Sequence, residues 1–227
     1  MNKKILRQCM LFSGLDDAAL IKYLELMDAH EQNYTRGSTV CAVTDAVPRF
    51  GLVLEGHIQV LRDDRDGHHT IMTNVGPGES FGESLCYLGR PSPVYIVAVA
   101  DCRIMWLSTA RLTNPVALSD YDTAALFCRF TAMLAARTLA MNQRIQLLSQ
   151  LTIRDKITTL LYSAAQQNGS ASFTLPMDRE DMAFYLGVNR SALSRELGNM
   201  RREGVIDFAG NRFTLLSREW QDAEDGQ

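Results

Sequence analysis

The sequence predicts an α+β chain with three parts: an N-terminal β-roll of jelly-roll type, a long helix and a C-terminal winged helix-turn-helix. Three observations predict it. Short β-rich segments broken by glycine and proline fill residues 31–107. Residues 118–151 contain neither glycine nor proline, which favours one long helix. Two short helices followed by a hairpin are expected at 178–215. We expect the domains to span 1–117, 118–151 and 152–227.

The composition is that of an ordinary soluble globular protein. Of the 227 residues, 46% are hydrophobic and 22% are charged, and the net charge is −3. This net charge argues against indiscriminate binding to nucleic acid, so any positive surface must be local. We find no apolar run long enough to span a bilayer and no signal-peptide pattern, which predicts a cytoplasmic protein with no membrane partner.

The N-terminal part begins with a helix at residues 15–30, where apolar side chains recur at helical spacing. Short strands then follow at close intervals, with glycines between them. The candidate strands are Thr39–Val43, Gly51–Leu54, His57–Leu61, Thr70–Thr73 and Val94–Ala100. Short, regularly spaced strands of this kind are typical of a sandwich, roll or jelly-roll.

Residues 118–151 predict one long helix with a dimer seam. Two interleaved series repeat every seven residues, which is typical of a coiled coil: Phe127, Leu134, Met141 and Leu148, and Phe130, Arg137, Arg144 and Leu151. We therefore expect a homodimer. The candidate dimerisation residues are Phe127, Phe130, Leu134, Arg137, Met141 and Leu148. The alternative is a long helix that packs only on its own β domain.

Residues 178–202 predict two short helices joined by a tight turn. Asp178 can cap the first helix and Asn189 the second, and Gly187 can adopt the left-handed turn conformation. Ala183 is small enough to let the helices cross closely. The apolar side of the pair is expected to consist of Met182, Leu186, Val188 and Leu193.

The second of these helices has one packing face and one exposed cationic face. At about 100° per residue, Arg190, Ser191, Ser194 and Arg195 fall within about 140° of one another, and Leu193, Leu197 and Met200 lie on the other side. Residues 189–202 contain four arginines and one glutamate, a net charge of +3. Arginine can pair with guanine edges, and serine suits phosphate or close backbone approach. The alternative is an ordinary helical pair with a solvated basic face.

A hairpin is predicted directly after this helix. Residues Ile206–Leu215 alternate apolar and polar side chains around Gly210-Asn211. A hairpin in this place makes a winged helix, and Arg212 at its tip could reach a phosphate. The alternative, that the hairpin only closes the small core, is compatible with this role. The candidate DNA-binding residues are Asn189, Arg190, Ser191, Ser194, Arg195, Arg201 and Arg212.

Five motifs together give the chain a family resemblance. They are LFSGL at 11–15, YTRG at 34–37, VLEGHIQV at 53–60, VGPGESFGE at 75–83 and GVNRSALSREL at 187–197. Their order resembles the Crp/Fnr family of bacterial transcription regulators over nearly the whole chain. The resemblance implies a homodimer that binds an inverted repeat in double-stranded DNA, a contact with RNA polymerase, and control by an effector at the roll.

The phosphate cassette departs from that of cyclic-AMP receptors, which opens Phe-Gly-Glu and carries an Arg-Ser or Arg-Thr pair some ten residues later. Gly82 and Glu83 match the opening, but Ser92 and Pro93 stand where the pair belongs. Burying a phosphate without an arginine fork is unfavourable. The Thr-Ser pair that meets adenine in those receptors corresponds here to Met141 and Asn142. The resemblance therefore implies a regulator that does not bind cyclic AMP.

A small-molecule effector stays open, and the sequence identifies no cofactor. The candidate effector residues are Gly82, Glu83, Tyr87, Arg90, Ser92, Met141 and Asn142. The alternative is that Glu83 caps a turn and the cavity is filled.

The spacing of the cysteines and histidines argues against several other classes of protein. The five cysteines, at 9, 41, 86, 102 and 128, form no CxxC, and a redox-responsive regulator would use Cys9 or Cys86, the least obviously buried. A cupin-like metal enzyme would need a His-x-His pair, whereas His68 and His69 are adjacent and point to opposite faces of a strand. We therefore expect no enzyme, no catalytic residues and no metal ligands. A third alternative is a ligand-binding or scaffold module that does not bind DNA.

Overall fold

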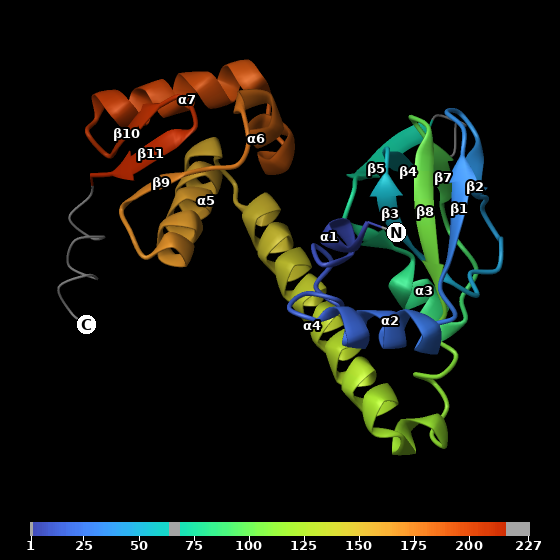
Figure 1. The fold of residues 1–227 in the computed structure, drawn as a ribbon. Helices are drawn as coiled ribbons and strands as arrows, with labels where there is room; N and C mark the ends of the chain where they lie inside the picture. The colour runs from blue at the N-terminus through green and yellow to red at the C-terminus, as the bar shows by residue number, and fades with distance from the viewer. Residues whose placement is uncertain (1, 64–68, 217–227) are drawn as a thin grey trace. The chain divides into compact units, whose positions relative to one another are not determined.

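The structure is a computed structural model that describes residues 2–63 and 69–216 (Figure 1). It contains two compact units, residues 1–137 and 138–227, each with its own contacts. The division falls inside the longest helix, α4 (Tyr121–Ser149). His68, one of the two adjacent histidines considered for a cupin-like metal site, lies outside the described residues.

The first unit is a roll of two four-stranded antiparallel sheets. One has the order β1-β8-β3-β6 and the other β2-β7-β4-β5. The strands are β1 (His30–Tyr34), β2 (Thr39–Cys41), β3 (Phe50–Glu55), β4 (Ile58–Asp63), β5 (His69–Val75), β6 (Ser80–Phe81), β7 (Tyr95–Ala98) and β8 (Cys102–Leu107). All five candidate strands from the sequence are confirmed, whereas β1, β6 and β8 were missed.

Short helices accompany the roll. They are α1 (Lys3–Leu6), α2 (Asp17–Leu26), α3 (Glu83–Leu88) and the 3-10 turn η1 (Ala117–Ser119). Figure 1 shows α2 and α3 at one end of the strands. The expected helix at 15–30 is therefore confirmed in its central part, where Asp16 caps α2 by accepting a hydrogen bond from the Ala19 N–H.

Strand β3 is buried on both faces and divides the roll into two hydrophobic clusters. Leu52 and Leu54 pack with Phe12 and Leu20 against α4, and Val53 faces the space between the sheets with Ile58 and Ile104. Successive side chains of a strand point to opposite faces, so the continuous apolar run at 52–54 serves both clusters.

The first half of α4 completes the roll's core. Phe130 is 1% exposed, and its ring centroid lies 5.9 Å from that of Phe50 and 5.6 Å from that of Tyr87. Phe127 and Leu134 are half-buried against the same cluster. The prediction that Phe130 lies in a dimer seam is therefore wrong, because its side chain is enclosed within its own subunit. The heptad pattern cannot tell a seam from a core-facing stripe.

By length and composition alone, α4 could cross a membrane, which corrects the expectation that no apolar run is long enough. The same criterion is met by core helices of soluble proteins. Here Leu126, Phe130 and Met133 are buried in the roll, so part of the helix's apolar character is explained by packing.

Within the described residues, the second unit contains the end of α4, three further helices and a small sheet. Its elements are α5 (Ile153–Asn168), β9 (Ser172–Thr174), α6 (Arg179–Leu186), α7 (Arg190–Arg202), β10 (Ile206–Ala209) and β11 (Arg212–Leu215). The predicted hairpin is confirmed, with Ile206 opposite Leu215 and Phe208 opposite Phe213. Strand β9, which the sequence analysis missed, pairs with β11 and makes the sheet order β10-β11-β9.

We expect Phe130→Ala to destabilise the roll by about 3–5 kcal/mol, because it removes a buried ring that contacts Phe50 and Tyr87. The measurement is urea unfolding followed by tryptophan fluorescence in a Trp220→Phe background, where Trp106 is the remaining tryptophan and reports on the roll. The control is Leu88→Ala, at a side chain that is 66% exposed, with an expected cost below about 1 kcal/mol. A similarly small cost for Phe130→Ala would show that Phe130 is not a core residue.

Candidate nucleic-acid interface and roll cavity

The first helix of the pair, α6, is fixed at both ends by its own sequence. The Asp178 carboxylate accepts hydrogen bonds from the backbone N–H groups of Glu180 (2.7 Å) and Asp181 (2.9 Å), and the Asp181 carboxylate accepts one from the Asp178 N–H. These donors hold the pKa of Asp178 below its usual value. At the other end Gly187 has φ +61°, the left-handed conformation that glycine adopts without strain. The predicted cap and turn are confirmed.

The second helix, α7, begins at the predicted cap. Asn189 Oδ1 accepts hydrogen bonds from the Ser191 N–H at 2.9 Å and from the Ser191 hydroxyl at 2.7 Å. Leu193, Leu197 and Met200 are at most 2% exposed and form the packing face. The angular division of α7 into a buried and an exposed face is therefore confirmed.

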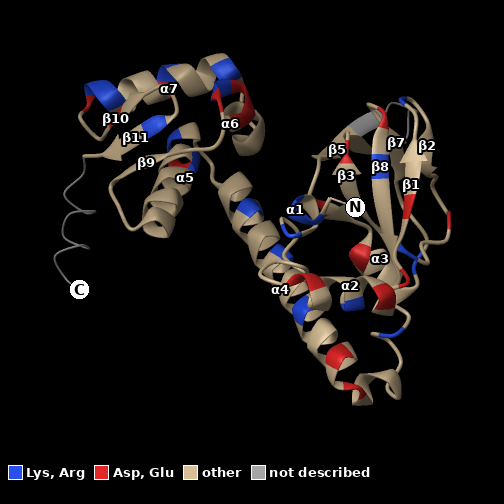
Figure 2. Cartoon of the chain, in the orientation of Figure 1, with Lys and Arg blue, Asp and Glu red and all other residues tan. Residues whose placement is uncertain are grey.

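The opposite face of α7 carries exposed cations with little internal neutralisation. All seven candidate DNA-binding residues are exposed. Arg190 approaches Glu180 at 3.6 Å, but both side chains are largely exposed, so this pair is weak. Arg195 and Arg212 have no ion pair within the described part of the chain. Figure 2 shows basic positions at several places along α7 and in β11.

Arg201 differs from the other candidates, because the hairpin holds its side chain. Its Nε lies 2.8 Å from Asp207 Oδ1 in an ion pair, and its guanidinium lies 5.3 Å from the centroid of the Phe208 ring. The side chain is 55% exposed. Arg201 is therefore preset in one position beside the wing and is less free than Arg195 to adapt to a base edge.

Arg154 of α5 orients α7 and was missed by the sequence analysis. Its Nε donates to Glu196 at 2.6 Å, and its two terminal nitrogens donate to the Glu203 carboxylate at 2.7 and 2.8 Å. The guanidinium lowers the pKa of Glu203 below its usual value. No sequence signal could connect these residues, since they lie 42 and 49 positions apart.

Arg179 connects the start of α6 to the wing, and it was missed as well. Its guanidinium lies over the rings of Phe208 (4.7 Å) and Phe213 (4.9 Å), and its Nη2 donates to the Gly210 carbonyl at 2.9 Å. Burial lowers the pKa of Arg179 from its usual value. This side chain therefore fixes the two-residue turn of the wing against α6.

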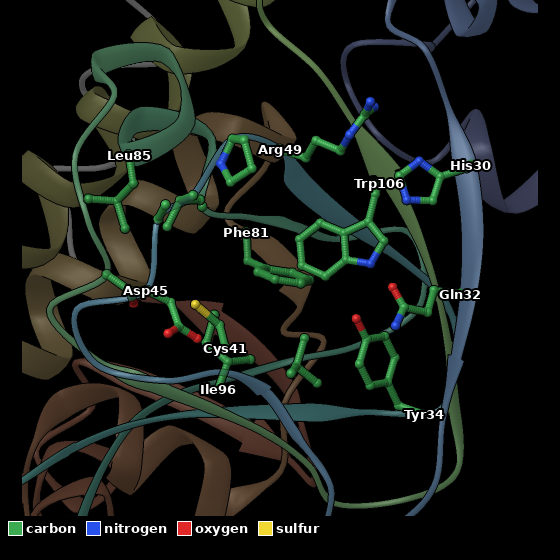
Figure 3. A pocket seen from close by; sticks show the side chains of 16 residues that line it. His30, Gln32, Tyr34, Cys41, Asp45, Arg49, Phe81, Leu85, Ile96 and Trp106 are labelled. Atoms are coloured by element: carbon green, nitrogen blue, oxygen red, sulfur yellow. The ribbon is translucent and has the colours of Figure 1, made fainter.

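A cavity of about 280 Å³ opens inside the roll (Figure 3). Of the seven candidate effector residues, Gly82 and Ser92 line it. Gly82 has φ +81° and precedes α3. Ser92 is 2% exposed, and its hydroxyl donates to the Val94 carbonyl at 2.8 Å.

Glu83 is buried beside the cavity but does not line it. Its Oε2 accepts from Arg137 Nη1 at 2.5 Å, and Arg137 Nη2 donates to the Ser80 carbonyl at 2.5 Å. Glu83 Oε1 is buried with no partner among the described residues. Glu83 is thus a buried carboxylate paired with the 45% exposed Arg137 side chain, and it does not cap a turn.

The other candidate effector residues lie away from the cavity lining. Tyr87 packs on Phe130 in the core, and Arg90 is exposed. Met141 and Asn142 are exposed on α4. The lining residues that the sequence analysis did not find include His30, Gln32, Tyr34, Cys41, Asp45, Arg49, Phe81 and Trp106. Tyr34 and Phe81 belong to the motifs at 34–37 and 75–83, but the lining as a whole comes from separate strands and loops, so no single local motif could have identified it.

Comparison with known proteins gives the family. Residues 31–116 match the cyclic nucleotide-binding domain and residues 155–220 the Crp-like helix-turn-helix domain, together more than half of the chain. The chain belongs to the Crp/Fnr family. It is a DNA-binding transcription regulator of this family, with a cyclic nucleotide-binding-like domain and a helix-turn-helix.

Curated relatives match this Crp/Fnr regulator over most of their length. It is 22% identical over 224 residues to a CRP-like cAMP-activated global transcriptional regulator of Mycobacterium tuberculosis, covering 95% of this chain and 96% of the relative. It is 27% identical over 210 residues to the transcriptional activator protein FnrL of Cereibacter sphaeroides, covering 86% and 82%.

Solved structures share its fold. OCPA-complexed CprK has a TM-score of 0.59 at 18% identity, covering 90% of this chain and 92% of that one. A putative cAMP-binding regulatory protein from Silicibacter pomeroyi has a TM-score of 0.53 at 20% identity, covering 98% of both chains.

The cysteines of the Crp/Fnr regulator are mostly enclosed. Cys9 and Cys86, expected to be the least buried, are 5% and 8% exposed, so that expectation is wrong. Burial raises the pKa of Cys9, Cys41 and Cys102, which lowers the thiolate fraction of each. Cys128 is exposed. Within the described residues, no group of three or more His, Cys, Asp or Glu side chains could hold a metal ion.

We expect Arg179→Met to loosen the wing, because it removes two cation–π contacts and the hydrogen bond to Gly210. These interactions together contribute about 1–2 kcal/mol, so amide hydrogen exchange in β10 and β11 should accelerate about tenfold. The control is Arg190→Met, which lies on α7 without a wing contact and should leave this exchange unchanged. Equal protection in Arg179→Met and the wild-type protein would contradict the role of Arg179.

Proposed function

We propose that this regulator is a homodimer that recognises a specific inverted repeat. Each subunit places the N-terminal half of α7 in a major groove, with half-sites about 34 Å apart. The observation that carries this proposal is the exposed cationic face of α7 opposite its buried packing face. The roll and α4 would then set the separation of the two helices.

The seven DNA-binding candidates divide into base-reading and phosphate-binding groups. Arg190 and Arg195 lack strong internal partners and suit bidentate pairing with guanine. Ser191 and Ser194 are small and exposed, so with Asn189 they permit close approach of α7 to the DNA backbone. Arg201 and Arg212, beside and in the wing, suit phosphate contacts.

We expect Arg190→Ala and Arg195→Ala each to weaken operator binding by about 1–3 kcal/mol and to relax the preference at one base pair per half-site. Arg212→Ala should weaken binding to all sequences equally and reduce the salt dependence by about one ion per subunit. The measurement is a mobility shift against the operator and its single-base variants at several salt concentrations.

The control for this series is Arg111→Ala, at an exposed position of the roll, which should leave DNA affinity unchanged. A uniform loss for Arg190→Ala and Arg195→Ala would assign these arginines to phosphates. Unchanged affinity after reversing both charges would favour the module that does not bind DNA.

We propose that the dimer seam uses the face of α4 that the roll leaves uncovered. Exposed side chains, most of them small, recur there at alternating spacings of four and three residues: Cys128, Ala132, Ala135, Leu139 and Asn142. Small side chains allow two helices to approach closely. Phe127, Leu134 and Met141 lie beside this face, about 80°, 100° and 120° from Ala135 around the helix. Arg137 is turned toward Glu83, and Leu148 is 41% exposed near the end of α4.

We expect mild oxidation with copper phenanthroline to cross-link most chains through Cys128, because parallel α4 helices around a two-fold axis bring the two Cys128 thiols together. The measurement is non-reducing electrophoresis, with light scattering of the untreated protein to give the mass relative to the 25.4 kDa chain. The control is Ala140→Cys in a Cys128→Ser background, which is exposed but about 140° from Ala135 around the helix. A monomer mass, or equal cross-linking at both positions, would contradict this seam.

We propose that DNA affinity is controlled at the roll by an effector other than cyclic AMP. Arg90 is exposed and the Ser92 hydroxyl is already bonded to Val94, so neither supports a buried phosphate. We further propose that the regulator acts in the cytoplasm, contacts RNA polymerase and catalyses no reaction. The redox-responsive alternative would depend on Cys128, because burial makes the thiols of Cys9, Cys41 and Cys102 less reactive.

A further inference from the structure

The roll cavity has a lining that includes neither Glu83 nor Arg137. Strands β1 and β8 contribute Gln32, Tyr34 and Trp106, and the segment 45–49 contributes Asp45 and Arg49. Figure 3 shows Gln32, Tyr34 and Trp106 around one space with Phe81, whereas the Arg49 side chain points away from it. Its volume of about 280 Å³ lies at the lower end of small-molecule sites, which suits a single ring with a short substituent.

The apolar part of the cavity favours a flat aromatic ring. Phe81 and Trp106 meet edge to face, with ring centroids 5.6 Å apart and planes at 78°. Tyr34 supplies a third ring, and Val47 and Ile96 add aliphatic surface. A bound ring can stack on one aromatic face while its edge meets another, which is the geometry that aromatic side chains prefer.

The polar part of the cavity offers hydrogen-bond donors. Trp106 Nε1 is buried without a hydrogen-bond partner, and it faces the Tyr34 hydroxyl without reaching bonding geometry. In Figure 3 the indole nitrogen lies on the side of the ring toward Gln32 and Tyr34. Burial raises the pKa of Tyr34, so its hydroxyl stays protonated and can donate. A ligand oxygen placed here would accept from these donors.

The charges of the cavity disfavour an anion. The Arg49 guanidinium is already paired with Asp28, whose carbonyl it also contacts at 2.6 Å. Asp45 accepts the Ala42 N–H at 2.7 Å and adds a negative charge to the lining. A carboxylate or phosphate would find no free guanidinium or ammonium among the lining residues, and the exposed His30 is the remaining lining group that can carry a positive charge, which is unfavourable for an anion.

We propose that this cavity binds a neutral, single-ring aromatic molecule that carries a carbonyl or similar acceptor oxygen. We also assign this class to the effector of the regulator, a step that rests on the function proposed above.

The test uses benzamide as the probe, titrated into the full-length Trp220→Phe protein without DNA, with Trp106 fluorescence as the signal. We expect a saturable change. Matched probes are benzoate, which adds a charge, cyclohexanecarboxamide, which removes the aromatic ring, and cyclic AMP. Each should bind at least tenfold more weakly than benzamide. Absence of benzamide binding up to its solubility limit, or equal binding of benzoate or cyclohexanecarboxamide, would overturn the proposal.

Two conservative variants locate the site. Trp106→Phe removes the indole N–H and Tyr34→Phe removes the hydroxyl, and each should weaken benzamide binding about fivefold to tenfold by calorimetry. Leu88→Ala, on the exposed side of α3, should leave it unchanged. Circular dichroism checks that each variant is folded, and Tyr34→Phe provides the test if Trp106→Phe does not fold. Unchanged affinity in a folded Tyr34→Phe protein would place the probe elsewhere.

A mobility shift with and without saturating benzamide separates the cavity from the effector assignment. We expect at least a threefold change in operator affinity. Benzamide binding without such a change would overturn the effector assignment and leave the binding site supported. Absence of operator binding by the unliganded and liganded protein alike, with benzamide still bound, would instead refute the proposed function.

Discussion

The structure depends on the apolar side chains of α4, which pack into the cores of both units. Leu126, Phe130 and Met133 of α4 enter the roll's core, and Leu147 enters the core of the second unit. At about 100° per residue, these side chains cannot also face a second subunit. The uncovered face is instead the one with Cys128 and its small neighbours. A seven-residue repeat alone could not make this distinction, because core stripes and seams share the spacing.

The sequence predicted the winged helix most completely, because its signals are local. A cap at Asp178, a glycine turn at 187, a cap at Asn189 and a Gly-Asn hairpin each act within a few residues. Strand β1 was missed because its sequence, HEQNY, has no apolar alternation and gains its place by pairing with β8. The cavity lining was mostly missed because tertiary packing brings its residues together from distant segments.

The exposed face of α7 stays cationic because the nearby carboxylates of Glu196 and Glu203 are bound to an arginine of α5. Glu196 lies within the helix and Glu203 caps its end, yet both point their carboxylates at Arg154 of α5. Exposed ion pairs of this kind contribute little to stability. Their stronger consequence is electrostatic, since carboxylates bound to Arg154 cannot neutralise Arg195. A chain with a net charge of −3 thus presents a locally positive surface.

The same roll residues that surround the cavity lead by direct contact to α4. Gly82 lines the cavity, its neighbour Glu83 begins α3, and the Glu83 carboxylate binds Arg137 of α4. Coupling between a ligand and a distant surface requires an element with two available arrangements. Glu83 Oε1 has no partner among the described residues, so the Arg137 guanidinium, which pairs with Oε2, can satisfy either one or both carboxylate oxygens. A ligand that shifts Gly82 therefore acts on Glu83, whose carboxylate binds Arg137 of α4. Within this unit, two neighbouring residues are enough to connect the cavity to the helix.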